Sequence, residues 1–172
     1  MNVRFASHMR TGVSVLMALL CLSILAAAVY PWFFTYAQIV DGYRVESALL
    51  IGAPQLVIPL IMLPLLAVQL YGLANLRRTF AAAARGDWFA TEAIDGFRRF
   101  AWSTVWMVPV NIVQKSATLA YVSWLDPAMK NVIAIDIGSG DIRSFVLAML
   151  FLFVAQIFAV GRQIDEDARS IL

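Results

Sequence analysis

The chain has 172 residues, of which 62% are hydrophobic and only 14% are charged, and its formal net charge is +2. Soluble domains are about 45 to 50% apolar, so a water-soluble fold of this length could not bury so much apolar surface. The small net charge, with aliphatic residues between the basic ones, also argues against a nucleic-acid surface. The charges cluster and leave four long stretches almost without charge, which predicts an integral membrane protein.

The first apolar stretch, residues 11–30, carries no charge. At about 1.5 Å per residue it spans a hydrocarbon core about 30 Å thick, and the aromatic residues that follow are typical of a membrane interface. A cleaved signal peptide is the alternative, because Arg4 and Arg10 precede the stretch and Ala26 and Ala28 form a small-x-small site. We favour a membrane span, since signal cores are only about 7 to 15 residues long.

The second stretch, residues 48–71, contains Pro54, Pro59 and Pro64. An interior proline removes a backbone hydrogen bond and presses on the preceding turn, so we expect a kinked helix. A gating hinge is one interpretation of these prolines. Prolines are common in membrane helices, however, and we favour a bent packing helix.

An arginine-rich segment, residues 72–99, separates the second and third stretches. Helical spacing of apolar residues up to Phe80 indicates that the second helix continues beyond the membrane. Gly86 and Asp87 then break it, and Thr91 offers the N-cap of a new helix. The segment is therefore predicted to be a short helical hairpin. Its candidate partner-binding residues are Arg77, Arg78, Trp88, Phe89, Arg98 and Arg99, although the two aromatic rings could instead anchor at the headgroups.

The third stretch, residues 100–125, is interrupted by Asn111, Gln114 and Lys115. Asn111 and Lys115 are four residues apart and so lie on one helical face, which should point toward other helices or toward water. An ion or proton site is the functional interpretation. We favour a structural one, in which Lys115 reaches the outer interface, because no carboxylate is expected within the membrane to pair with it.

The outer loop, residues 126–143, holds a β-branched segment closed by glycines, which predicts a short strand and turn on the membrane surface. Its acids Asp136 and Asp141 are predicted to be solvated, because they provide too few oxygen ligands for a calcium loop. The fourth stretch, residues 144–161, is broken by Gln156, which we expect to hydrogen-bond to a neighbouring helix.

Lys and Arg residues outside the four stretches divide nine to three between the two sides of the membrane. This bias places both termini and the hairpin in the cytoplasm. The predicted fold is all-α: one domain, residues 1–172, forming a membrane four-helix bundle with both ends inside and a cytoplasmic helical hairpin between helices 2 and 3.

The residues that enzymes use are scarce in this chain. Apart from tyrosines, the four stretches provide only Cys21 and Lys115 as titratable groups, and the single histidine, His8, lies on the N-terminal arm. Acid-base, metal and haem chemistry need several convergent groups or an axial ligand. We therefore predict no catalytic, metal-binding or cofactor-binding residues, and no enzyme.

Several short motifs are made up of Leu73, Leu76, Arg77, Phe80, Gly86, Phe89, Thr91, Phe97, Arg98, Phe158, Gly161, Asp165 and Glu166. In these residues the chain resembles a bacterial family of small four-helix membrane proteins, the YoaS-like domain of unknown function numbered twenty-nine seventy-five. The resemblance implies a multi-pass protein of the bacterial cytoplasmic (inner) membrane, whose relatives are often encoded beside a small helix-turn-helix regulator. The tail departs from the family, since it is less rich in glutamate and ends in Ser170, Ile171 and Leu172 rather than Leu-Thr-Val.

These features are compatible with two functions. The first is a non-enzymatic module that senses or tethers, in which the arginine hairpin binds a cytoplasmic regulator protein. The alternative is a small transporter or channel subunit that acts as a homo-oligomer, with a path lined by the kinked second helix and the face of Asn111 and Lys115. Both functions have the lipid bilayer as a partner, and neither includes direct binding of nucleic acid.

Overall fold

The structure is a computed structural model that describes residues 3–29, 39–40, 43–44, 53–86, 90–125, 135 and 137–170. Four long helices dominate the described residues, and two two-residue strands pair antiparallel, with Ile39 opposite Arg44. The all-α prediction with four helices is confirmed. In chain order the elements are α1 (Val3–Val29), β1 (Ile39–Val40), β2 (Tyr43–Arg44), α3 (Ala53–Ala84), α4 (Thr91–Leu125) and α5 (Ser139–Ser170).

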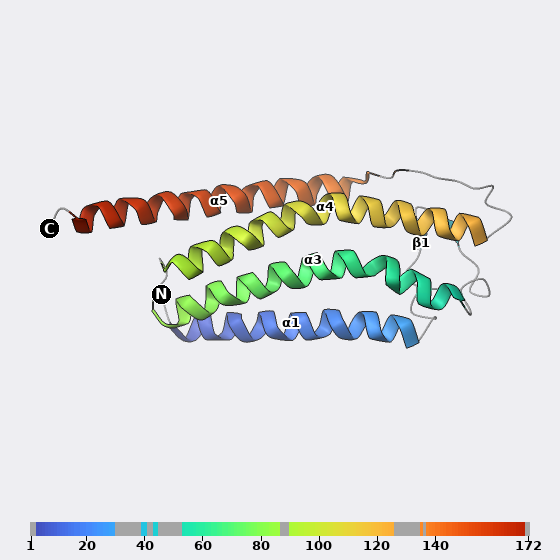
Figure 1. Cartoon of the computed structure of the whole chain (residues 1–172), viewed down its shortest axis with the longest axis horizontal. Coiled ribbons are helices and arrows are strands. Elements are labelled where there is room, and N and C mark those ends of the chain that lie inside the picture. Colours follow the sequence, from blue (N-terminus) through green and yellow to red (C-terminus); the bar gives the residue numbers. More distant parts are fainter. Residues whose placement is uncertain are drawn as a thin grey trace.

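The four helices lie side by side in one row (Figure 1). Each helix packs mainly on the next one along the chain, so that α3 and α4 form the middle and α1 and α5 lie at the two edges. This arrangement corrects the predicted bundle in one respect, because the helices do not surround a common core. Among the described residues, a row leaves both broad faces and the outer sides of the two edge helices uncovered.

Three of the helices are long and apolar enough to cross a membrane. The qualifying segments are Phe5–Ala26 of α1, Leu56–Ala84 of α3 and Ser139–Ile164 of α5. They overlap the predicted stretches 11–30, 48–71 and 144–161. The third predicted stretch, residues 100–125, is not among these segments; it lies in α4, which packs between α3 and α5.

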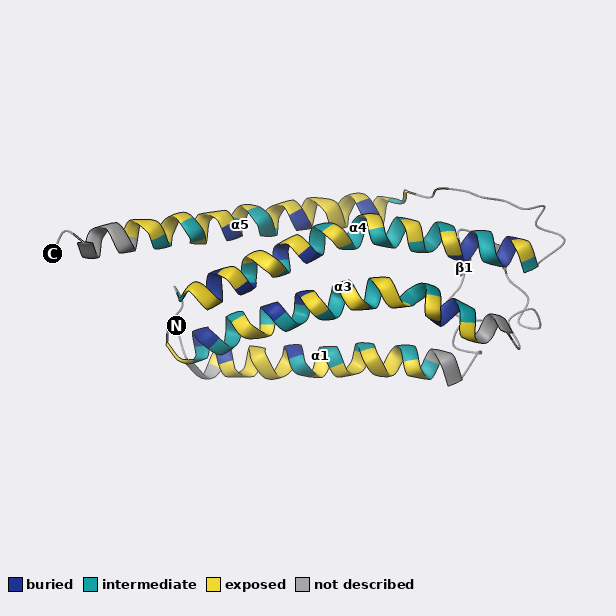
Figure 2. Cartoon of the chain, in the orientation of Figure 1, coloured by how far each residue is buried: buried dark blue, intermediate teal, exposed yellow. Residues whose placement is uncertain are grey.

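The surface of the row is apolar where a soluble protein would be polar. Figure 2 shows exposed residues along most of α1 and α5, and these include Leu25, Phe153 and Ile157, each more than half exposed. A soluble monomer rarely exposes so large a contiguous apolar surface. Lipid is therefore the solvent that suits these helices, which supports the membrane assignment.

Small residues bring α3 and α4 close together. A Cβ atom added at Gly96 of α4 would lie 2.6 Å from the Thr79 hydroxyl oxygen and 2.8 Å from the backbone oxygen of Asn75. The Thr79 hydroxyl also donates a hydrogen bond to the backbone oxygen of Ala93 across the interface, at 3.0 Å. Small residues and interhelical hydrogen bonds are what hold membrane helices together, so this pair is the closely packed centre of the row.

Phenylalanine rings join α4 to α5. Phe97 packs edge-on against Phe151 and Phe158, with ring centroids 6.5 and 5.9 Å apart. The ring centroids of Phe100 and Phe151 are 5.5 Å apart. Such tilted contacts are favourable beyond the area that they bury. They set the register of α5 against α4.

Prolines lie in both central helices. Pro59 and Pro64 are inside α3 and Pro109 is inside α4, and both helices are bowed in Figure 1. The bend expected in the second helix therefore has a counterpart in the third. Pro54 differs from the prediction, because it is in the first turn of α3, where a proline removes no helical hydrogen bond.

The connection between α3 and α4 follows the predicted break. Gly86 has a φ of +89°, in the left-handed region that favours glycine, and its amide donates to the backbone oxygen of Ala83. The backbone oxygen of Ala90 accepts the first bonds of α4, from the amides of Ala93 and Ile94. The N-cap is therefore Ala90 rather than the predicted Thr91, a shift of one residue.

Candidate functional site

The site with the most polar contacts joins α4 to the start of α5. The Asp141 carboxylate accepts a hydrogen bond from the Asn111 side-chain amide at 2.8 Å and pairs with the Lys115 ammonium at 2.9 Å. Only 4% of Asp141 is exposed. Each of its two carboxylate oxygens therefore has a partner on the neighbouring helix.

Helix geometry explains why these three residues meet. Asn111 and Lys115 lie on one face of α4, as their spacing predicted. Asp141 lies in the first turn of α5, where it also accepts the Gly138 amide at 3.1 Å. This contact is half of a capping box, and the positive end of the helix dipole favours a carboxylate at this position. The register that Phe97 and Phe158 set brings Asp141 level with Lys115.

Two predictions about this region are wrong. Asp141 is buried and paired rather than a solvated loop acid, and Lys115 has a carboxylate partner. The reason is that α5 begins at Ser139, ahead of the predicted start at residue 144, so Asp141 belongs to the helix. Asp136 lies outside the described residues, as does most of the predicted strand that precedes it.

The ion pair lies well inside the row. At about 1.5 Å per residue, Lys115 is roughly 24 Å along α4 from Arg99 and roughly 15 Å from the end of the helix at Leu125. Near that end lie Tyr121 and the exposed Trp124, whose ring centroids are 6.5 Å apart. Tyrosine and tryptophan are enriched at membrane interfaces. The Lys115 side chain is 37% exposed, which leaves one side of the pair open to the surroundings.

A cavity of about 310 Å³ borders the ion pair between α3, α4 and α5. Asp141 and Asn111 contribute to its wall, together with the polar side chains of Gln69, Thr104 and Ser144. The rest of the wall is aliphatic or aromatic. Within the described residues, no group of three or more His, Cys, Asp or Glu side chains could hold a metal ion. The arrangement suits a small polar solute or several waters beside a fixed carboxylate.

The other two intramembrane polar residues of the prediction lie apart from this cluster. Gln114 is half-buried in α4, and its side-chain oxygen accepts no hydrogen bond from the described residues. Gln156 is exposed on α5. The expected contact of Gln156 with a neighbouring helix is not seen within the described part of the chain.

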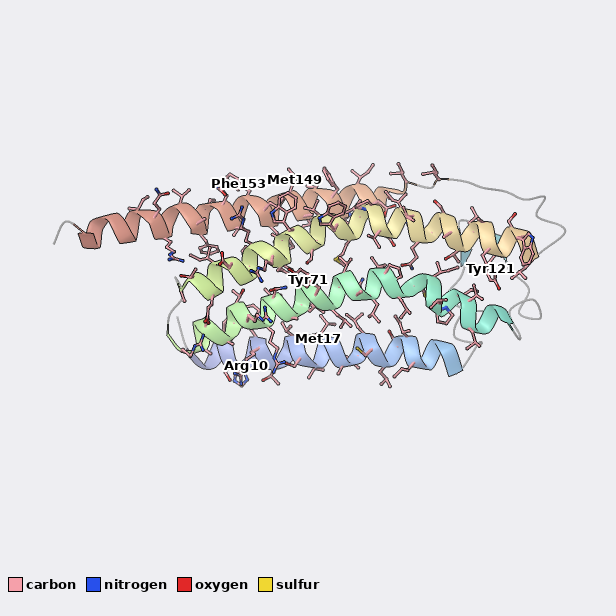
Figure 3. The ribbon with its side chains drawn as sticks, in the orientation of Figure 1. Arg10, Met17, Tyr71, Tyr121, Met149 and Phe153 are labelled. Atoms are coloured by element: carbon pink, nitrogen blue, oxygen red, sulfur yellow. The ribbon has the colours of Figure 1, made fainter. Side chains whose placement is uncertain are left out.

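The predicted partner-binding arginines gather where α3 ends and α4 begins. Arg77 and Arg78 of α3 and Arg98 and Arg99 of α4 are all exposed. Arg10 of α1 lies toward the same end of the row (Figure 3). Trp88 and Phe89, the other two predicted partner-binding residues, lie outside the described residues.

An ion pair crosses the connection between α3 and α4. The Arg85 guanidinium donates to the Glu92 carboxylate at 2.8 Å, and both side chains are more than two-thirds exposed. Exposed pairs of this kind contribute about 0 to 1 kcal/mol. The pair therefore adds little stability, and either residue can exchange this partner for another at little cost.

The cluster around Asp141 could be predicted from the sequence only in part. The shared face of Asn111 and Lys115 follows from their spacing, and an acid in a first helical turn is a recognised start signal.

Comparison of the chain with models of protein families, with curated proteins and with solved structures found no match. The resemblance to the YoaS-like family therefore stays a prediction.

Proposed function

We propose that the chain is a non-enzymatic module of the bacterial cytoplasmic membrane that senses or tethers a cytoplasmic regulator protein. In this proposal all four helices cross the bilayer, both ends are cytoplasmic, and the α3–α4 connection faces the regulator. The observation that carries it is the group of four exposed arginines at that connection: Arg77, Arg78, Arg98 and Arg99.

The packing beneath these arginines supports the proposal. Close contact at Gly96 and the hydrogen bond from Thr79 hold the ends of α3 and α4 together, so the arginines lie on two closely packed helix ends. Positive residues also mark the cytoplasmic side of membrane proteins. An acidic regulator surface would be drawn to them by electrostatic complementarity, which governs association rate and partner choice.

Charge reversal at the arginines tests the tether. In protein purified from native membranes in detergent, we expect Arg77→Glu with Arg98→Glu to remove the regulator that copurifies with the wild type, because both positive contacts become repulsive. The measurement is the amount of copurified protein, quantified by mass spectrometry. Arg143→Glu is the matched control, since Arg143 is also exposed but lies on α5 near Asp141. Unchanged recovery in the double variant, or no partner in the wild type, would end the proposal.

A second function is favoured by the ion pair beside the cavity. In a small transporter or channel subunit, Asp141 and Lys115 would be polar groups that line a solute pathway through the bilayer, since buried ionisable residues in membranes often mark such pathways. A row of four helices encloses no path, so several copies would have to assemble. Liposome flux separates the two functions: Asp141→Asn removes the flux of a transporter and leaves the recovery of a tethered regulator unchanged.

A further inference from the structure

Two cavities meet at Arg99 on the α3–α4 pair. The first, of about 390 Å³, is polar and is lined by Asn75, Arg78, Glu92, Asp95, Gly96 and Arg99. The second, of about 470 Å³, is mostly apolar, and its wall includes Tyr71, Trp102 and Trp106 as well as Arg99. We call the two together the Arg99 groove.

Helical spacing makes the Arg99 groove continuous. On α3, Val68, Tyr71, Asn75 and Arg78 recur every three or four residues and so form one stripe. On α4, a matching stripe runs from Glu92 through Asp95, Arg99 and Trp102 to Trp106. The groove is therefore polar near the connection between the helices and aromatic farther along them, toward the middle of the row.

The polar half of the groove carries balanced charges. Arg78 and Arg99 provide two guanidinium groups, and Glu92 and Asp95 provide two carboxylates. Glu92 is shared with Arg85 in an exposed ion pair, so it can be released to a ligand at little cost. Such a site complements a ligand with one positive and one negative group better than an ion of a single sign.

The floor of the polar half has an acceptor that the described residues do not satisfy. Asn75 is only 2% exposed, and its side-chain amide donates to the backbone oxygen of Tyr71 at 2.8 Å. Its side-chain oxygen has no hydrogen-bond partner among the described residues. Buried polar groups are nearly always paired, so an unpaired acceptor beside a cavity indicates a missing donor.

We propose that the Arg99 groove binds one phospholipid with a phosphoethanolamine headgroup. The phosphate accepts hydrogen bonds from Arg78 and Arg99, and the primary ammonium donates to Glu92 and Asp95. One acyl chain lies along Tyr71, Trp102 and Trp106.

The aromatic half of the groove is the reason for choosing a lipid over a soluble zwitterion. Tyr71 and Trp106 are more than half exposed, and Trp102 nearly half, in helices whose surroundings are apolar. An acyl chain would cover these rings, and in the proposed topology, on which the lipid site rests, the arginines lie at the cytoplasmic surface, the level of the lipid phosphates. The lipid site shares Arg78 and Arg99 with the proposed regulator surface, but the regulator test changes only Arg77 and Arg98, which do not line the groove, so the two proposals can fail separately.

The headgroup preference follows from the same residues. A choline headgroup has no N–H to donate to Glu92 or Asp95, although its phosphate could still contact the arginines. An anionic headgroup without an ammonium would leave the two carboxylates facing added negative charge. Phosphatidylethanolamine should therefore bind more tightly than phosphatidylcholine or phosphatidylglycerol with the same acyl chains.

Native mass spectrometry of the full chain in detergent tests the lipid site. An equimolar mixture of these three lipids is added, and the bound fraction of each is measured. We expect phosphatidylethanolamine to be preferred by about tenfold, and Arg99→Ala to lower its binding by about tenfold, the usual effect of losing one charge-assisted hydrogen bond. Asp95→Asn should reduce the preference over phosphatidylcholine. Arg98→Ala, at the neighbouring exposed arginine outside the groove, should change neither quantity.

Other outcomes would overturn the lipid site. Equal binding of the ethanolamine and choline lipids, a preference for the anionic lipid, or an equal loss in Arg98→Ala would each contradict it. Soluble phosphoethanolamine that competes as well as the lipid would show that the acyl chain is not held. If Arg99→Ala lost its helical circular dichroism, Asp95→Asn would decide the question, because the Asp95 side chain is exposed. The quantity to compare is then the ratio of bound phosphatidylcholine to bound phosphatidylethanolamine in Asp95→Asn and in the wild type.

Discussion

Asp141→Ala is expected to destabilise the folded protein by about 3 kcal/mol, the low end of the cost of breaking a buried ion pair. Asp141 is 4% exposed and has partners on α4 and at the start of its own helix. Its removal leaves the Lys115 ammonium without a counter-ion and the Gly138 amide without its acceptor. Because Lys115 is 37% exposed and can still reach polar surroundings, the upper end of the range is not expected.

Unfolding in mixed micelles, with increasing fractions of a denaturing detergent, measures this change. Glu92→Ala is the matched control, because it breaks an ion pair of nearly the same length that is exposed rather than buried. The control should change the free energy of unfolding by no more than about 1 kcal/mol. Equal effects of the two substitutions would mean that the Lys115–Asp141 pair is as solvated as the Arg85–Glu92 pair.

Gly96→Val is the second large effect and should cost about 3 kcal/mol or more. The first added carbon alone would lie 2.8 Å from the backbone oxygen of Asn75, which cannot turn aside as a side chain can. The helices α3 and α4 must separate, and overpacking of this kind typically costs about 1 to 3 kcal/mol before the hydrogen bond from Thr79 is counted.

The control for Gly96 is another helical glycine. Gly161 of α5 has no atom within 4 Å of an added carbon, so Gly161→Ala should leave stability unchanged or raise it by up to about 1 kcal/mol. The same unfolding assay compares the two variants. A Gly96→Val protein as stable as the wild type would show that α3 and α4 are not in close contact in the bilayer.

The four helices could be predicted because each depends on a long local stretch of apolar residues. The start of α5 could not be placed in the same way, since the Gly-Ser-Gly-Asp sequence at residues 138–141 is typical of a turn. The Lys115–Asp141 contact joins residues on different helices, and no local pattern in the sequence reports it. The sequence therefore places Asp141 in a loop, although an acid in a first helical turn is an ordinary start signal.

The arrangement of the helices in a row could also not be predicted from the sequence. In a soluble bundle the apolar face of a helix identifies its packed side, but lipid and a neighbouring helix are equally apolar. Small residues are the remaining signal. Gly72 and Ser103, like Gly96 and Thr79, face each other across α3 and α4, and their pairing became evident only from the structure.

In the proposed topology α4 crosses the membrane, which places its two ends on opposite sides. Single cysteines at Arg85→Cys, before α4, and at Ile137→Cys, after it, can be introduced together with Cys21→Ser and labelled with an impermeant maleimide. Both positions are exposed. We predict labelling of Ile137→Cys in intact cells, and of Arg85→Cys only after the membrane is permeabilised. Labelling of both positions from outside, or of neither, would contradict the crossing of α4, and labelling of Arg85→Cys alone would contradict its proposed orientation.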